Sequence, residues 1–94
     1  MTLVGKQMLR DFALLHADIR APLNAWEREV LTATWASPQD VKNRYQHVSF
    51  LAGGRVIFNI KGGRYRLQVR VDYEFETVIV QRIGTHEEYN GWEL

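Results

Sequence analysis

"FNIKGGRYRLQVRV", residues 58–71, carries the clearest structural pattern in the chain. Apolar and polar side chains alternate through two runs, and Gly62-Gly63 separates the runs. A period of two is typical of a β-strand with one buried face, and a glycine pair between two such runs indicates a hairpin turn. The stretch therefore predicts two antiparallel strands, and almost all of their polar positions are cationic.

Similar runs on either side extend the predicted sheet. They are rich in β-branched and aromatic residues, and glycine pairs or the polar corner at residues 73–76 separate them. We expect four antiparallel strands in a meander: Val48–Leu51, Arg55–Lys61, Tyr65–Tyr73 and Thr77–Ile83. One face of this sheet is apolar and is expected to pack on helices, through Val56, Phe58, Ile60, Leu67, Val69 and Val71.

The first half of the chain predicts helices. Apolar residues recur at helical spacing in residues 5–16 and again after Pro22, which suits a first helical position. The apolar faces are Met8, Leu9, Phe12 and Leu15 in the first segment and Leu23, Trp26 and Val30 in the second. A third, short helix is expected to begin with Ser37 as N-cap and Pro38 as first helical residue, and to run to about Arg44.

Together these elements predict an α+β fold with N-terminal helices packed on a mostly antiparallel, four-stranded sheet. A chain of 94 residues is long enough for one modest core, so we expect a single domain over residues 1–94. The chain contains no cysteine, which suits a reducing compartment, and the cytoplasm is the simplest expectation. Neither a signal peptide nor a membrane-spanning helix is expected.

Positive charge is concentrated in the strands. The formal net charge is only +1, yet residues 48–73 contain five Lys or Arg against Asp72 alone. The predicted polar face of the sheet consists of Asn59, Lys61, Arg66, Gln68, Arg70 and, if the last strand pairs in register, Arg82. Such a face is either ordinary solvated surface or a groove that binds phosphates, with Tyr65, Tyr73 and Tyr89 available to stack on bases.

The segment "IGTHEEY", residues 83–89, adds titratable groups after the last strand. Cleavage of RNA by its own 2′-OH needs a base, an acid for the leaving 5′-oxygen and cations for the crowded phosphate. Candidates for the base and the acid are His86, Glu87, Glu88 and Tyr89, and the basic strands offer the cations. A lone histidine is more often an ordinary surface residue, and a metal site is not expected, because adjacent carboxylates on an extended chain point apart.

The motifs "FNIKGGRYRL" and "GTHEEY" together resemble the HigB family of toxin–antitoxin mRNA interferases, within the RelE/ParE superfamily. The resemblance covers nearly the whole chain in the same order. It implies a compact α+β toxin that enters the A site of the 70S ribosome and cuts translated mRNA, without a cofactor. It also implies a cognate HigA-type antitoxin of the helix-turn-helix class.

Members of the superfamily do not share one fixed acid–base pair, so the candidate residues of the site are ranked by their chemistry. Expected catalytic residues are Lys61, Arg66, His86 and Tyr89, and expected RNA-binding residues are Asn59, Arg64, Gln68, Arg70 and Arg82. Which group acts as base and which as acid stays open. The alternative is a toxin that binds without cleaving, as in the ParE-like branch. The antitoxin is expected on the helical side, where Arg20, Glu27, Arg28 and Glu29 form a mixed-charge surface.

Overall fold

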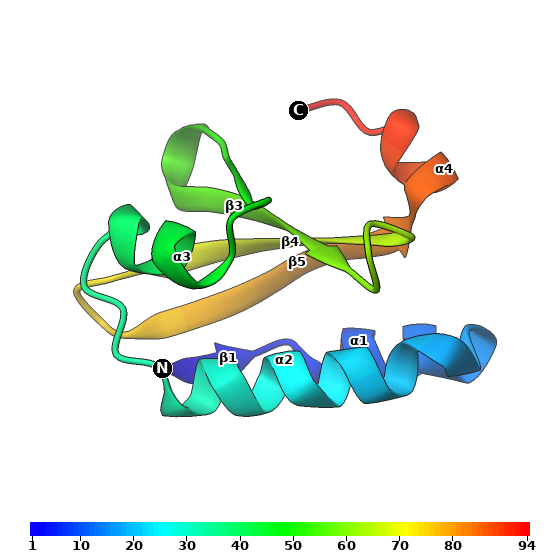
Figure 1. Cartoon of the computed structure of the whole chain (residues 1–94), viewed down its shortest axis with the longest axis horizontal. Coiled ribbons are helices and arrows are strands. Elements are labelled where there is room, and N and C mark those ends of the chain that lie inside the picture. Colours follow the sequence, from blue (N-terminus) through cyan, green and yellow to red (C-terminus); the bar gives the residue numbers. More distant parts are fainter.

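The computed structural model describes all 94 residues, as a layer of helices packed on one face of a twisted sheet (Figure 1). The strands are β1 (Thr2–Val4), β2 (Ser49–Phe50), β3 (Arg55–Ile60), β4 (Tyr65–Asp72) and β5 (Thr77–Thr85), and the helices are α1 (Lys6–Leu15), α2 (Arg20–Thr32), α3 (Pro38–Arg44) and α4 (His86–Asn90). Two short 3₁₀ turns, η1 (Ala17–Ile19) and η2 (Ala52–Gly54), complete the element order. The predicted α+β fold is confirmed.

The sheet has five strands in the order β1-β5-β4-β3-β2, rather than the four expected. The four predicted strands are present and pair antiparallel. The additional strand, β1, runs parallel to β5, with Leu3 opposite Val78. Three residues are too few to show a periodic pattern, which is why the sequence did not predict β1. Strand β1 forms by pairing with the edge of β5.

The inner face of the sheet is the hydrophobic core that the alternating pattern predicts. All six expected side chains of β3 and β4 are buried there, as are Leu23, Trp26 and Val30 of α2. The Trp26 and Phe58 rings meet edge to face with their centroids 5.4 Å apart. Helices α1 and α2 lie side by side below the sheet, whereas α4 and the C-terminal end lie above it (Figure 1).

The inward stripe of α1 differs from the predicted one. Leu9 and Ala13 are buried, whereas Met8 is 40% exposed and Leu15 is 81% exposed. An α-helix turns by about 100° per residue, so positions 9 and 13 define one line along the helix, and positions 8 and 15 lie well to one side of it. The small side chain of Ala13 faces the core because its position on the helix, and not its hydrophobicity, directs it there.

The other helix boundaries agree closely with expectation. Helix α2 begins at Arg20 instead of Pro22, because η1 leads directly into it, and Pro22 lies within its first turn, where a missing N–H costs nothing. Helix α3 spans Pro38–Arg44 with Ser37 at its N-cap position, as predicted. None of these helices is of a length and apolarity that would cross a membrane.

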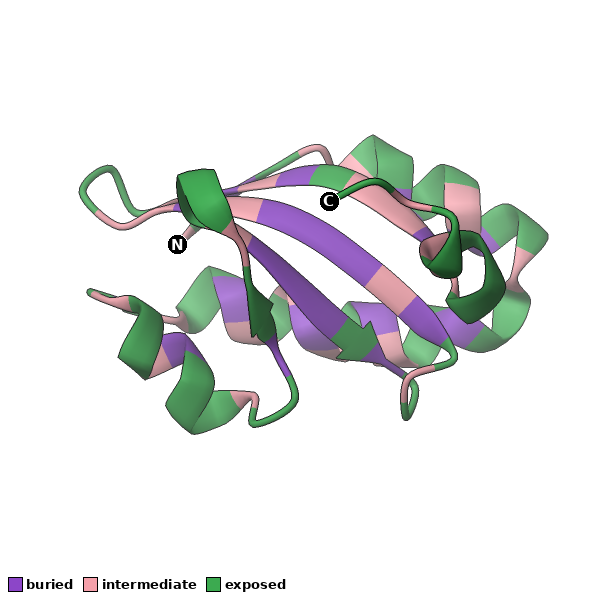
Figure 2. Cartoon of the chain, turned by 90° about the horizontal axis from the view of Figure 1, so that it is seen from above, coloured by how far each residue is buried: buried purple, intermediate pink, exposed green.

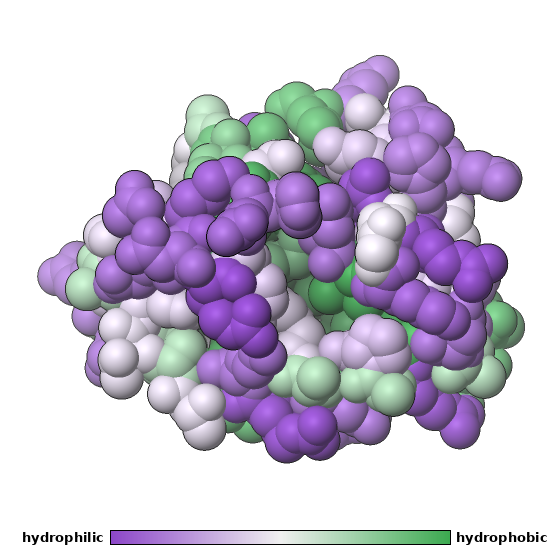
Figure 3. Space-filling model, in the orientation of Figure 1, coloured by the Kyte–Doolittle hydropathy of each residue, from purple (hydrophilic) through white to green (hydrophobic).

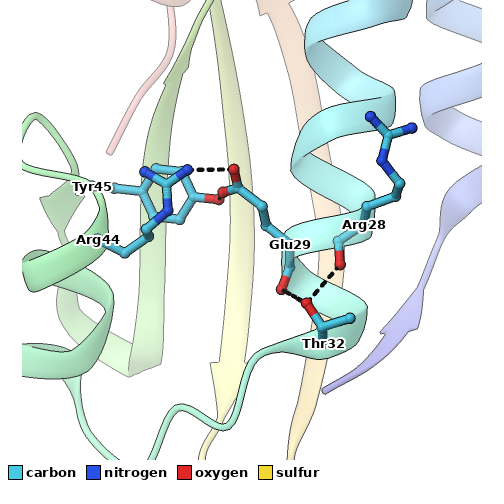
Figure 4. Close-up of polar contacts among 5 residues, drawn as sticks. All are labelled: Arg28, Glu29, Thr32, Arg44 and Tyr45. Atoms are coloured by element: carbon cyan, nitrogen blue, oxygen red, sulfur yellow. Dashed lines mark hydrogen bonds and ion pairs between the residues drawn. The ribbon is translucent and has the colours of Figure 1, made fainter.

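Glu29 joins α2 to the end of α3 (Figure 4). Its carboxylate accepts hydrogen bonds from Arg44 and from the Tyr45 hydroxyl. Burial, followed by this bond to Glu29, raises the pKa of Tyr45. One turn along, the Thr32 hydroxyl donates to the Arg28 and Glu29 carbonyls. Glu29 therefore has internal partners and is not part of a free mixed-charge surface on α2.

Candidate functional site

The candidate site lies at one end of the sheet, where the turn between β3 and β4 meets α4. A shallow hollow of about 410 Å³ opens there, and its lining is entirely polar or glycine: Asn59, Gly62, Gly63, Arg64, Arg66 and His86. A second hollow of about 330 Å³ borders Arg64 and His86 and is also lined by Tyr65, Thr85 and Glu87. The structure thus brings together Asn59, Arg64, Arg66 and His86, which lie on β3, the following turn, β4 and α4.

Helix α4 presents His86 to this hollow. The last strand was expected to end at Ile83, but residues 84 and 85 continue β5, and Thr85 caps a helix that begins at His86. The Thr85 hydroxyl accepts from the Glu88 N–H at 3.1 Å, while the Glu88 carboxylate accepts from the Thr85 N–H at 2.9 Å. This bond to the backbone of Thr85 lowers the pKa of Glu88. Glu88 therefore serves to cap the N-terminus of α4.

A backbone contact fixes His86 relative to the turn between β3 and β4. The His86 N–H donates to the Arg64 carbonyl at 2.8 Å. Because both partners are main-chain groups, this contact does not depend on side-chain rotamers. The first turn of α4 and the turn between β3 and β4 are thus held as one unit at the site.

Arg66 is held between the turn and α4. Its guanidinium donates to the Gly63 carbonyl, and its Cζ lies 5.0 Å from the centroid of the Tyr89 ring. Gly63 has a φ of +91°, and a Cβ there would lie 3.2 Å from Arg66 Nη1, so glycine suits both the backbone and the space. The arginine is thereby oriented before any ligand arrives.

Lys61 does not lie on the outer face of the sheet, where it was predicted. Strand β3 ends at Ile60, and Lys61 adopts a positive φ of 52° in the turn. Its ammonium donates to Asp18 of η1 at 2.9 Å, on the helical side of the molecule. Strand parity applies only while the strand continues, and the left-handed turn redirects this side chain.

Asp18 is the centre of a small ionic cluster that sequence reasoning missed. It accepts from the Tyr65 hydroxyl and from Lys61, and Arg64 Nη1 lies 3.6 Å from its Oδ2. The bond from Tyr65, followed by the one from Lys61, lowers the pKa of Asp18 from 3.8 to about 2, and the same bond raises the pKa of Tyr65. These partners are remote in sequence from Asp18, so no local pattern indicates the cluster.

Arg82 lies on the outer face, although the simple alternation of β5 would place it inward with Val78 and Val80. A β-bulge between the pairs Gln68↔Arg82 and Val69↔Val80 inserts Gln81 and reverses the parity of the later residues of the strand. Arg82 Cζ then lies 4.6 Å from the centroid of the Trp92 ring. Trp92 in turn packs on Gly84, where an added Cβ would lie 2.9 Å from Trp92 Cζ2.

Gln68 was predicted to bind RNA, but it is only 5% exposed. Its Nε2 donates to Gln81 Oε1 at 2.9 Å, and its own Oε1 is buried without a partner. Ile57, opposite Gln68 on β3, is also buried. The side chains in the middle of the outer face are therefore largely inaccessible to solvent (Figure 2). Arg70, beyond it, is half-buried.

Two of the tyrosines considered as base-stacking partners are not free. Tyr65 is 6% exposed and packs edge to face with Phe12, and Tyr73 is partly buried and packs against the hydrophobic core. Tyr89 remains partly exposed beside Arg66. No three histidine, cysteine or acidic side chains are grouped as ligands of a metal ion would be.

Comparison with known families decides the relationship. A family model, HigB_toxin, described as the RelE-like toxic component of a toxin–antitoxin system, matches residues 19–92. The chain belongs to the HigB toxin family. The match to the HigB model spans α2 to Trp92 and so includes every candidate residue, whereas β1 and α1 lie outside it. No curated protein matches the sequence.

Proposed function

We propose that this HigB-family protein is an endoribonuclease that cleaves translated mRNA in the A site of the ribosome. The observation that carries the proposal is the meeting of His86, Arg64 and Arg66 at one open hollow, with the Tyr89 ring of α4 against Arg66. Titratable groups and cations converge there on a surface that a phosphate can reach. The 94 residues would act as one toxin domain in the cytoplasm, where mRNA is translated.

The chemistry is an attack of the 2′-OH on the adjacent phosphorus. A base takes the 2′-OH proton as the new O–P bond forms, and an acid protonates the 5′-oxygen as the old bond breaks, leaving a 2′,3′-cyclic phosphate and a 5′-OH. His86 and Tyr89 are the two proton-transfer groups in this proposal, because Lys61 is paired with Asp18. Arg66, and Arg64 beside it, would stabilise the charge that gathers on the phosphate.

The ribosome would supply the alignment that this small site lacks. The hollow is shallow and open, and few groups line it, so it cannot by itself hold an RNA strand in line for attack. Purified protein is therefore expected to cut free RNA poorly. No metal ion or other cofactor is required for this chemistry.

A toxin–antitoxin component has an antitoxin partner, and we propose a HigA-type protein that binds the helical side. Between α1 and α2 lies a groove of about 250 Å³ that Arg10, Leu14, Arg20 and Glu27 border among others. Leu14 is 73% exposed there. An exposed leucine among charges of both signs suits a protein partner, and this groove lies on the opposite face of the sheet from α4 (Figure 1).

The deciding experiment is single-turnover cleavage of mRNA on programmed ribosomes by the parent chain and by His86→Ala. Loss of a proton-transfer group lowers the rate by about 10²–10⁴-fold. The control is Glu74→Ala, because Glu74 is exposed in the turn between β4 and β5, at the other end of β5 from His86. A parent chain that arrests translation without cutting mRNA would instead identify a toxin that acts by binding alone.

A further inference from the structure

A larger hollow lies next to the proposed cleavage site, and none of the proposed chemistry uses it. It measures about 630 Å³ and lies between the segment that follows α3 and the end of β3. Its lining is Arg44, Tyr45, Gln46, His47, Val48, Asn59 and Gly62. A volume of this size is within the range of about 300–1,000 Å³ that ordinary ligand sites occupy.

The two hollows are adjacent. Asn59 and Gly62 line both the large hollow and the one that contains Arg66 and His86. Gly62 has a φ of +62° and no atom within 4 Å of an added Cβ, so the turn projects no side chain between the hollows. A strand that lies across the site can therefore extend over Asn59 and Gly62 into the large hollow.

The large hollow has the chemistry of a nucleotide site. Arg44 and His47 are exposed, Gln46 and Asn59 offer amide groups, and no acidic side chain lines it. Arg44 Cζ lies 4.9 Å from the centroid of the Tyr45 ring, and the Glu29 carboxylate on α2 accepts hydrogen bonds from both side chains (Figure 4). The guanidinium is thus pre-oriented, and only part of its donor capacity is used. Hydrophilic residues dominate the face of the molecule that Figure 3 presents.

We propose that this hollow binds a nucleotide of the same mRNA strand that is cut beside His86, with Arg44 on its phosphate and His47 and Gln46 near its base. The inference rests on the proposed function and adds a subsite to it. An arginine that binds a phosphate but takes no part in the reaction affects how tightly RNA is held and not how fast bound RNA is cut. Arg44 and His47 would thus determine affinity and the preference for sequence around the cut.

The test uses programmed ribosomes and the variants Arg44→Ala and His47→Ala. We expect Arg44→Ala to raise the protein concentration needed for half-maximal cleavage by about tenfold, as loss of one charge-assisted contact does, while the rate at saturation stays at the parent value. Lys6→Ala is the control of equal charge change, because Lys6 lies at the start of α1, next to β1 at the opposite edge of the sheet from β2 and β3.

A second measurement identifies the strand. Uncleavable mRNA with a 2′-deoxy group at the scissile position carries one 4-thiouridine at each flanking position in turn, and the cross-linked peptide is mapped by mass spectrometry. We expect one flanking position to cross-link to residues 44–48. Weaker binding by Arg44→Ala without that cross-link would mean that ribosomal RNA occupies the hollow, which overturns the inference.

The two proposals fail in different ways. Parent-like affinity of both Arg44→Ala and His47→Ala, together with normal dependence on His86, would overturn only the subsite. Absence of cleavage by the parent chain would remove both proposals. Because Arg44 also binds Glu29, the unfolding midpoint of each variant is measured, and Arg44→Lys, which keeps the charge, is expected to recover part of the affinity.

Discussion

The guanidinium of Arg66 lies over the ring of Tyr89, with Cζ 5.0 Å from the ring centroid, and this contact joins β4 to α4 at the candidate site. The arginine is therefore placed by the same aromatic ring whose hydroxyl is proposed to transfer a proton. An interaction of this kind contributes roughly 0.5–2 kcal/mol, enough to select one orientation of a partly exposed arginine. The two roles of Tyr89 can be separated by mutation.

Tyr89→Phe removes the hydroxyl and keeps the ring over Arg66. We expect the single-turnover rate on programmed ribosomes to fall by about 10²–10⁴-fold with little change in affinity. Tyr89→Ala removes both, so it should lose affinity as well, because Arg66 is no longer held. A Tyr89→Phe variant that cuts at the parent rate would show that only the ring matters.

We expect Asp18 to stabilise the fold in a pH-dependent manner. Its pKa is lowered from 3.8 to about 2, so its stabilising contribution is fully present above about pH 4 and is lost as the pH falls toward 2. Asp18→Asn should therefore lower the urea midpoint at pH 7 and weaken the dependence on pH between 4 and 2. Asp11→Asn is the control, since Asp11 has only a Gln7 side chain as partner. Parallel pH profiles for parent and Asp18→Asn would contradict this role.

Gly84 lets α4 and Trp92 approach the sheet. An added Cβ would lie 2.9 Å from Trp92 Cζ2 and 3.2 Å from Glu88 Cβ, so Gly84→Ala should cost about 1–3 kcal/mol of unfolding free energy and slow cleavage by displacing α4. Gly91→Ala is the control, since its Cβ would meet nothing closer than 3.5 Å. Adding Trp92→Ala should restore part of the activity of Gly84→Ala. Strictly additive losses would show that the two residues are not coupled.

We predict that Gln68 is a structural residue that does not contact RNA. Its Oε1 is buried without a partner, so Gln68→Leu removes an unsatisfied acceptor and should leave the free energy of unfolding unchanged or raise it by about 1 kcal/mol. Its partner Gln81 is exposed and can bind water instead. Denaturant unfolding and affinity on ribosomes test this together. A tenfold loss of affinity would return Gln68 to the RNA-binding surface.

The groove between α1 and α2 should bind the antitoxin. Leu14→Glu places a charge where we expect an apolar contact, so it should weaken the complex by tenfold or more, measured by calorimetry with the cognate antitoxin. Cleavage on ribosomes should be unaffected. Phe75→Glu, at another residue that is 73% exposed, is the matched control. Equal affinities of the parent and Leu14→Glu would place the antitoxin elsewhere.

The helix that carries His86 and Tyr89 has a signal in the sequence that the expected strand and site did not include. Thr85 followed by Glu88 is the pattern of a capping box, and it indicates that a helix begins at His86. With that helix recognised, Tyr89 falls one turn after His86 on the same side of α4. Asp18, in contrast, has partners in a turn remote in sequence, and no pattern around it predicts them.

The hairpin of β3 and β4, its buried face and the chemical types at the site can all be predicted from local rules, because alternation and glycine turns act over a few residues. The positions of several of those side chains depend instead on tertiary contacts. The left-handed turn directs Lys61 to Asp18, the bulge at Gln81 brings Arg82 to the outer face, and close packing buries Gln68. Each of these outcomes depends on a partner distant in the chain, so strand parity alone cannot supply it.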